Sequence, residues 1–384
     1  MEVRCPIHGL ISYNALEERV INSRVMQRLR GIRQLAMACL VYPGAVHTRF
    51  DHSLGVMHVA GTMAELLGLR GEEWQNIRLA GLLHDVGHGP FSHVSEIPLA
   101  VLSANYAERR AIDLEKLHEC ITVDVINHDH ELREILEGRR EAIARLIDSV
   151  KYLGRTVARQ IISGPLDADK LDYLLRDSHF CGVKYGVYDL ERVLNGLTPI
   201  SEAASESSVG IKHESVWAVE QHLMARYHMT IQVYRHRVRR STDLLLARAA
   251  LLAAQAEIAD IADLYTYSGP RKAFTERWLS YSDYGLLCAI MRNGRASRAA
   301  KLVSCLNSRA LSFSVLSIPL DRLGTFYQSR VLTPAEQQEL EKRVANKCSV
   351  DRDRVIVDVV RTEPPRPSSS EPAIDLDRDY ALRA

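Results

Sequence analysis

Apolar residues return every three or four positions along most of the first 195 residues of the chain. On a helix this spacing places them on one face, whereas a half-buried strand needs strict alternation, which is scarce here. The pattern therefore predicts a mostly α-helical domain. The clearest helical stretches are 20–35, 54–67, 74–84, 132–153 and 168–177.

Further along the chain the pattern changes several times. Residues 201–210 (SEAASESSVG) read as a small polar loop, and residues 215–258 read as one or two long helices. Pro270 marks a boundary because proline interrupts helices, and helices are again expected over 276–291 and 334–345. We predict a domain over 1–270 with a core over 27–195, a smaller C-terminal α+β lobe over 271–360 with a strand at 354–360, and a proline- and serine-rich tail over 361–384.

Net charge, cysteine spacing and the length of apolar runs exclude several classes of protein. The net charge of +1 excludes an overall polybasic chain, and the seven cysteines are scattered without a CxxC pair. Neither a disulfide framework nor a cysteine zinc site is therefore indicated. No apolar run reaches the roughly 18 residues of a membrane helix, and the first twelve residues lack the basic and apolar regions of a signal peptide. These observations predict a cytoplasmic protein that is not associated with a membrane.

A histidine-aspartate pair, His84 and Asp85, follows an apolar helical run at 77–83. A carboxylate at the end of such a run needs a partner, because an unpaired buried charge is costly. Imidazole and carboxylate together are a common ligand set for a catalytic divalent cation. His88 lies one helical turn after His84, where it could act as a general acid or base.

A second polar cluster follows the proline at 165. Helical spacing places Asp169, Lys170, Tyr173 and Asp177 on one side of a helix. Taken singly, each feature can also be explained by an ordinary structural role. A histidine-aspartate dipeptide is common, His52 alone would be an ordinary buried histidine, and the helix face would be a salt-bridged surface. The order His52, then His84 and Asp85, then Asp169 is what favours a metal site.

Long motifs carry a resemblance to a known family. The chain resembles the HD-domain phosphohydrolases, and within them the SAM-and-HD-domain deoxynucleoside triphosphate (dNTP) triphosphohydrolases and their bacterial relatives. The resemblance implies an HD-domain helical bundle over 1–270 with its catalytic core at 27–195. The matching motifs are PIHGLI (6–11), QRLRGIRQL (27–35), YPGAVHTRFDHSLGV (42–56), AGLLHDVGHGPFSH (80–93), DADKLDYLLRDS (167–178) and, more weakly, YRHRV (234–238).

The resemblance assigns a role to each matching residue. It implies one divalent cation (manganese, iron, magnesium or zinc), with His52, His84, Asp85 and Asp169 as its ligands. His88 matches the histidine that protonates the leaving group, His118 matches a histidine that supports it, and Arg49 belongs with them and Asp85 in the catalytic set. The implied substrate contacts are Gln34, Arg49, His93, Lys170, Tyr173, Asp177, Tyr234 and Arg235.

Within that set, Arg49, His93 and Lys170 match phosphate contacts, and Tyr173 matches the ring that lies under a deoxyribose. Gln34 and Asp177 match groups that read the sugar 3′-hydroxyl. Two positions depart from the regulated animal enzymes: Arg235 replaces a glutamine, and Asn22 replaces an aspartate in a guanine-reading allosteric site. Gln27 and Arg30 match that allosteric site. An amide accepts from guanine with one oxygen only, which leaves activation open.

The implied reaction is hydrolysis of a dNTP to a deoxynucleoside and inorganic triphosphate. Two alternatives stay open: an HD-domain phosphodiesterase, nuclease or nucleotidase acting on another phosphoester, and a nucleotide sensor without catalysis. The arginines between 226 and 240 could bind single-stranded nucleic acid. The resemblance also predicts a homo-oligomer, either a dimer or a tetramer.

Overall fold

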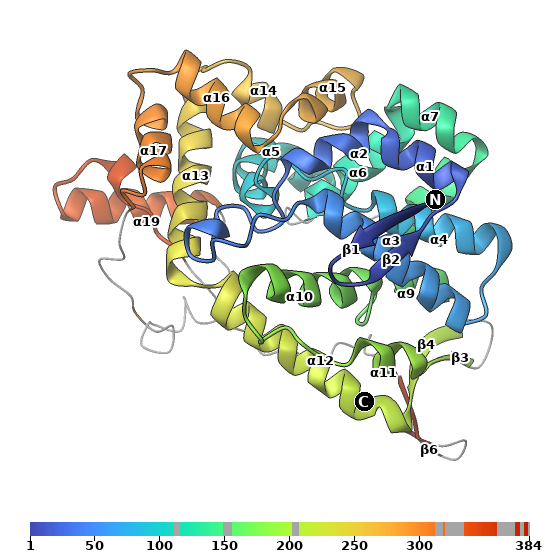
Figure 1. Cartoon of the computed structure of the whole chain (residues 1–384). Coiled ribbons are helices and arrows are strands. Elements are labelled where there is room, and N and C mark those ends of the chain that lie inside the picture. The colour runs from blue at the N-terminus through green and yellow to red at the C-terminus, as the bar shows by residue number, and fades with distance from the viewer. Residues whose placement is uncertain are drawn as a thin grey trace.

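The computed structural model describes residues 1–110, 116–148, 156–201, 207–311, 318, 334–358, 373–376 and 380–382. Helices dominate these residues, so the predicted mostly-α class is confirmed (Figure 1). The strands are short and form two small sheets at the edge of the helical body.

A central helix, α3 (Arg49–Leu66), organises the fold. It is buried along almost its whole length, and a helix that is buried on all sides belongs to the interior. It packs against α4 (Gly71–Leu83) and α10 (Ala168–Cys181), which carry the two polar clusters of the sequence. The surrounding helices are α5 (Glu96–Arg110), α6 (Leu117–His128), α7 (His130–Leu136), α8 (Arg140–Ile147), α9 (Val157–Ile162) and α11 (Leu190–Asn195).

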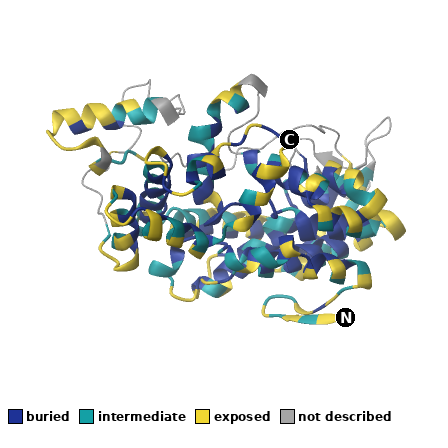
Figure 2. Cartoon of the chain, turned by 90° about the horizontal axis from the view of Figure 1, so that it is seen from above, coloured by how far each residue is buried: buried dark blue, intermediate teal, exposed yellow. Residues whose placement is uncertain are grey.

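The chain begins with an antiparallel hairpin, β1 (Glu2–Cys5) and β2 (Gly9–Ser12), in which Glu2 pairs with Ser12. This hairpin lies at the periphery of the molecule (Figure 2). The predicted helix over 20–35 is wrong as a single element, because Ser23 caps a new helix in extended conformation. The stretch holds the end of α1 (Ala15–Asn22), α2 (Arg24–Arg28) and a 3₁₀ turn, η1 (Leu29–Gly31).

The long helical stretch after residue 215 is two helices, as predicted. A π-helical turn, η7 (Thr230–Tyr234), joins α12 (Val216–Met229) to α13 (Arg237–Gln255). Such turns are rare and often lie at functional sites. The remaining described helices are α14 (Ile261–Tyr265), α15 (Lys272–Ser280), α16 (Asp283–Asn293), α17 (Arg298–Asn307) and α19 (Pro334–Lys347), with further 3₁₀ turns η2 (Ala38–Leu40), η3 (Ser92–Ser95), η5 (Glu137–Arg139), η6 (His213–Ser215) and η9 (Arg352–Arg354).

Two expectations about strands were wrong. The polar segment 201–210 is not only a loop, because its described ends belong to β3 (Leu197–Ser201) and β4 (Ser207–Lys212). The predicted strand at 354–360 is not a strand over 354–358, and residues 359–360 lie outside the described part. Instead β5 (Ala373–Leu376) pairs in parallel with β4, and β6 (Tyr380–Leu382) pairs with β5.

The predicted domain boundaries stay predictions. One buried apolar cluster runs from Ile11 to Leu306 and crosses Pro270 without a break. Much of the predicted lobe and tail lies outside the described residues. Where the chain is described, no helix combines the length and the apolarity needed to cross a membrane.

Candidate metal centre

The histidine-aspartate pair lies on a tight turn at the end of α4. His84 is the C-terminal cap of this helix, and the chain then turns back towards α6. Gly87 allows this turn, because a side chain there would meet the Thr122 backbone nitrogen at 2.3 Å. Two distant groups hold the turn: Trp278 Nε1 donates to the Gly87 carbonyl at 2.9 Å, and Arg28 Nη1 donates to the His88 carbonyl at 2.9 Å.

The four predicted metal ligands converge from three helices. His52 Nε2 lies 3.0 Å from Asp169 Oδ1 and 3.6 Å from Asp85 Oδ2. His84 Nε2 lies 3.2 Å from Asp85 Oδ1 and 3.8 Å from Asp169 Oδ1. The two imidazole rings meet edge to face with their centroids 5.2 Å apart. Residues separated by over a hundred positions thus share one small volume.

The imidazole nitrogens fit a cation at this point. His84 uses Nδ1 on the Gly81 carbonyl at 2.8 Å, and His52 uses Nδ1 on Asp172 at 2.7 Å. These bonds occupy each Nδ1, so Nε2 is the nitrogen that would give its lone pair to a cation in place of a proton. Both Nε2 atoms are buried and make no hydrogen bond. Two orphaned nitrogens that face two carboxylates form a suitable donor set for a divalent metal.

The pKa shifts of His52 and Asp169 also favour a bound cation. Burial lowers the pKa of His52, but the Asp169 and Asp172 carboxylates outweigh it and raise this pKa to about 10. Burial would raise the pKa of Asp169, yet its contacts with the two histidines hold it below its usual range. The carboxylates therefore create a negative environment that attracts positive charge, which a bound divalent cation would satisfy.

Asp172 is a further candidate residue of the centre that the sequence did not single out. Its carboxylate holds His52 Nδ1 and also receives two bonds of 2.8 Å from Arg176, one helical turn away. Both residues are fully buried. They pack against Gly55 of α3, where a side-chain carbon would lie 1.9 Å from Asp172 Oδ1. On a helix, Asp172 lies one turn from both Asp169 and Arg176. This spacing allows several side-chain pairings, so the sequence alone did not show which one forms.

Arg49 stands at the first turn of α3 and points into the centre. Its Nη1 donates to Asp85 Oδ2 at 2.5 Å and its Nε donates to Ser92 at 2.7 Å, while Nη2 is buried without a partner. Burial would raise the pKa of Asp85, but the Arg49 guanidinium and the neighbouring histidines hold it well below its usual range. The free Nη2 leaves one donor for an anion.

Three histidines gather around Glu96 beside the centre. The rings of His88 and His118 stack with centroids 4.4 Å apart. Glu96 Oε1 accepts from His93 Nδ1 at 2.8 Å and lies 3.1 Å from His118 Nδ1 as an ion pair. Burial and the Arg49 and His118 cations lower the pKa of His88 well below 6.5. Burial also opposes the charge on His118, yet Glu96 raises its pKa. Glu96 was missed in the sequence because a single glutamate on a helix is ordinary.

The predicted sugar contacts lie together, next to the centre. Asp177 is buried between His47 Nε2 and the Tyr234 hydroxyl, at 2.8 Å from each. The rings of Tyr173 and Tyr234 are 6.1 Å apart at a steep angle. The π-helical turn η7 positions Tyr234 here. Gln34 is buried with an unpaired Oε1. This group therefore offers a carboxylate, an amide oxygen and two rings.

For two predicted phosphate contacts, Lys170 and His93, the structure gives less direct support. Lys170 Nζ bonds the Gly164 carbonyl at 3.0 Å and pairs with Asp167 at the start of its own helix. The side chain of His93 is 61% exposed and pairs with Glu96. Arg235 follows η7, is partly buried, and has its pKa lowered by burial and by Arg240. These positions stay predictions as phosphate or base contacts.

The arginines between 226 and 240 do not form a continuous strip. Arg239 is buried and donates to the Tyr234 carbonyl at 3.1 Å. Arg240 makes a bidentate pair with Asp358. Arg237 is exposed. One arginine of this basic stretch is therefore buried, one is held in an ion pair and one is exposed. This arrangement weakens the prediction of a surface that binds nucleic acid.

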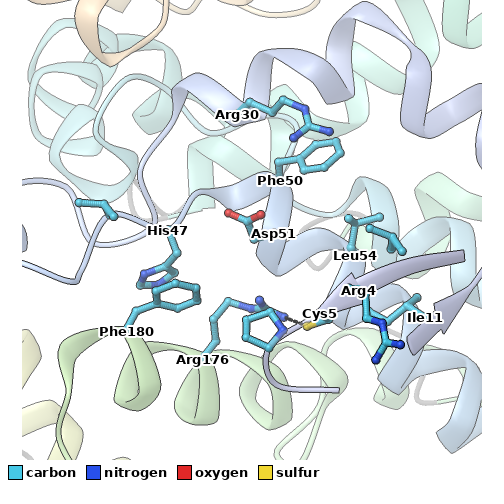
Figure 3. Close-up of a pocket in the computed structure, with 13 residues that line it drawn as sticks. Arg4, Cys5, Ile11, Arg30, His47, Phe50, Asp51, Leu54, Arg176 and Phe180 are labelled. Carbon is cyan, nitrogen blue, oxygen red and sulfur yellow. Dashed lines mark hydrogen bonds between the residues drawn. The ribbon is translucent and has the colours of Figure 1, made fainter. Parts of the chain in front are cut away.

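Two of the three residues of the predicted allosteric set are in contact. Gln27 accepts from Arg30 Nε at 2.8 Å, and Asn22 is exposed at the end of α1. Arg30 stacks over Phe50 at 3.6 Å and lines a cavity of about 370 Å³ between the N-terminal hairpin, α3 and α10 (Figure 3). Asn22 and Gln27 are not among its lining residues.

Asp283 of α16 is a further residue that sequence reasoning missed. It accepts the backbone N–H of Phe91 at 2.6 Å and that of Arg33 at 3.0 Å. Phe91 and the next residue, Ser92, have left-handed backbone conformations that need such support. A single aspartate 192 positions away from Phe91 carries no sequence signal for this role.

Comparison with known proteins agrees with this geometry. The model of the HD domain matches residues 49–177, and the model of the HD-associated region matches residues 189–380. An uncharacterized protein of Methanocaldococcus jannaschii is 36% identical over 269 residues, which is 68% of this chain and 52% of the relative. The deoxynucleoside triphosphate triphosphohydrolase SAMHD1 of Homo sapiens is 30% identical over 275 residues, 65% of this chain and 44% of that enzyme.

A solved structure supports the fold. The crystal structure of a phosphohydrolase from Bacteroides thetaiotaomicron superposes with a TM-score of 0.74 at 22% identity, covering 100% of this chain and 93% of that one. The chain spans about half the length of the curated relatives named above. The matched regions together contain the converging histidines and aspartates and the helices around them, and the chain therefore belongs to the HD-domain phosphohydrolase family.

Proposed function

We propose that this chain is a metal-dependent phosphohydrolase that splits a dNTP into a deoxynucleoside and inorganic triphosphate. One observation carries the metal dependence: two buried imidazole nitrogens without hydrogen bonds face the carboxylates of Asp85 and Asp169. His52, His84, Asp85 and Asp169 would hold the ion. A divalent cation bound there would polarise a phosphate and supply an activated water.

The residues around the ion fit a phosphate. Arg49 keeps its Nη2 free for a phosphate oxygen while Asp85 holds the rest of the guanidinium in place. His88 is buried beside the same aspartate, with its Nε2 3.3 Å from Asp85 Oδ1. From this position it can hand a proton to the leaving 5′-oxygen once the charge of a bound phosphate offsets the burial and the Arg49 cation that lower its pKa. His118, which is paired with Glu96, keeps the ring in place by stacking.

The side chains around Asp177 support a deoxynucleoside as the substrate. Asp177 and Gln34 offer oxygen acceptors for a 3′-hydroxyl, and the Tyr173 ring would lie under the sugar. A ribose carries one more oxygen at C2′, which would press against this ring. SAMHD1 of Homo sapiens, whose name states this activity, is 30% identical to this chain over 275 residues. The preferred base and the metal are left to experiment.

The test is a panel of nucleotides incubated with the purified chain and Mn²⁺, Fe²⁺, Mg²⁺ or Zn²⁺. Triphosphate release with dNTPs, absent for His84→Ala, is the expected result. Labelled single strands and cyclic nucleotides in the same panel test the alternative phosphoesters. No triphosphate from any dNTP across pH 6–9 would remove the proposed reaction, and nucleotide binding without turnover in a metal-loaded sample would favour a sensor.

The homo-oligomer stays a prediction from the resemblance. Light scattering during size-exclusion chromatography, with and without dNTPs, measures the mass of the particle directly. A mass close to the 43.2 kDa of one chain under all conditions would contradict it.

A further inference from the structure

The turn of the N-terminal hairpin places a histidine beneath the candidate metal centre. His8 lies between β1 and β2, and although the hairpin is peripheral, its side chain is only 4% exposed. His8 Nε2 lies 2.6 Å from Asp172 Oδ1. An aspartate carboxylate can only accept, so His8 donates this bond.

Asp172 connects this histidine to a proposed metal ligand. Its other oxygen, Oδ2, accepts from His52 Nδ1 at 2.7 Å. The path from His8 through Asp172 to His52 is therefore a continuous buried chain of hydrogen bonds. Arg176 donates to both oxygens of the same carboxylate, at 2.8 Å each.

A second side chain of the hairpin reaches the same ion pair. Cys5 Sγ lies 3.4 Å from Arg176 Nη2, and Figure 3 shows this contact at the edge of the cavity. Cys5 and His8 flank the hairpin turn, so both ends of the turn are fastened to the Asp172–Arg176 pair. A hairpin kept only as an edge of the fold would not need two bonds to a buried ion pair.

We propose that His8 is a positioning residue that sets the metal affinity of the centre through Asp172. The inference rests on the metal site of the proposed function. With His8 present, donors on both sides of the carboxylate fix its rotation and aim Oδ2 at His52. Without His8, Arg176 is the strong donor to Oδ1 that remains among the described residues. The carboxylate can then turn towards the guanidinium, and His52 loses alignment with the ion.

The test measures metal binding without any substrate. Mn²⁺ is titrated into metal-free protein, and free Mn²⁺ is followed by electron paramagnetic resonance. Partners bonded directly to a ligand typically change affinity by about 10–100-fold. His8 is one bond further away, so we expect His8→Ala to weaken Mn²⁺ binding by roughly 3–10-fold. His8→Gln places an amide donor near the Nε2 position and should recover most of the affinity.

Two controls separate positioning from folding. Leu10→Ala changes an exposed residue of the same hairpin, 45% exposed, and should leave Mn²⁺ affinity unchanged. The visible spectrum of the Co²⁺-loaded protein reports ligand geometry, so it should change in His8→Ala and return in His8→Gln. Metal-free unfolding midpoints of all variants show whether the fold is kept.

The outcomes distinguish the two proposals. If wild type binds Mn²⁺, His52→Ala abolishes binding, and folded His8→Ala binds as wild type does, the positioning role is refuted while the metal site stands. If His8→Gln is as weak as His8→Ala, the hydrogen bond is not the cause and the inference is equally overturned. If wild type binds no metal at all, the proposed function itself fails.

Discussion

Replacing Gly55 by alanine tests the packing behind the metal centre. By helix propensity alone, an alanine inside α3 should stabilise the protein by about 1 kcal/mol. The structure predicts the opposite, because the new carbon would lie 1.9 Å from Asp172 Oδ1 and 2.4 Å from Arg176 Nη2. Neither group can move into solvent, since both are fully buried.

The size of the effect follows from these contacts. Overpacking costs about 1–3 kcal/mol, and breaking a buried ion pair costs about 3–5 kcal/mol. If the pair breaks only partly, then after subtracting the propensity gain we expect a net loss of about 2–5 kcal/mol in the free energy of unfolding. Because Asp172 also orients His52, Mn²⁺ affinity should fall by about 10–100-fold.

Urea unfolding followed by circular dichroism, together with Mn²⁺ titration, measures both effects. Gly285→Ala is the matched control: this glycine lies in α16, where a new carbon would be 3.3 Å from Ser282 Oγ and 4.0 Å from Tyr281. It should be neutral or slightly stabilising and should leave metal binding unchanged. A Gly55→Ala protein as stable as wild type, with wild-type metal affinity, would refute the reasoning about this contact.

Further predictions concern the centre and one buried histidine. Asp169→Asn should lose bound metal and activity together, as read by metal analysis and triphosphate release; an active, metal-loaded variant would contradict the ligand role. His88→Ala should keep the metal and lower turnover by about 10²–10⁴-fold, and a turnover near wild type would remove it as the proton donor. Tyr173→Ala should raise the ratio of ribonucleotide to deoxynucleotide hydrolysis, whereas an unchanged ratio would leave the ring without that role. Burial lowers the pKa of His222 to about 3, so the unfolded chain binds its proton first as pH falls below 6.5. Stability should then drop with falling pH, by about 2 kcal/mol at pH 5 relative to pH 7 from this group, and the difference between wild type and His222→Leu in urea unfolding isolates it; parallel curves would contradict the assignment.

The convergence of His52, His84, Asp85 and Asp169 could be anticipated because their order favours a metal site and the family resemblance implies that they are its ligands. Helical class could be anticipated from the periodicity of buried positions, as in α3, α4 and α10. Helix boundaries were harder, since Ser23 interrupts an apolar pattern that continues across it.

What the sequence could not supply are contacts across long separations. Asp172, Glu96 and Asp283 are ordinary aspartates and glutamates until their partners are known, and those partners lie 120, 22 and 192 positions away in His52, His118 and Phe91. The strands β5 and β6 were missed for a similar reason, because each is stabilised by a neighbour in the sheet and not by its own few residues.

The contacts of Asp283 also indicate how far the chain can be shortened before the candidate metal centre loses its support. It caps the backbone of the loop after His88 from a helix that begins 13 residues beyond Pro270. A fragment ending at that proline would retain every proposed metal ligand, yet the N–H groups of Phe91 and Arg33 would lose their acceptor and the Gly87 carbonyl would lose the indole of Trp278. A fragment that keeps these contacts therefore has to include α15 and the start of α16 as well as the sequence motifs.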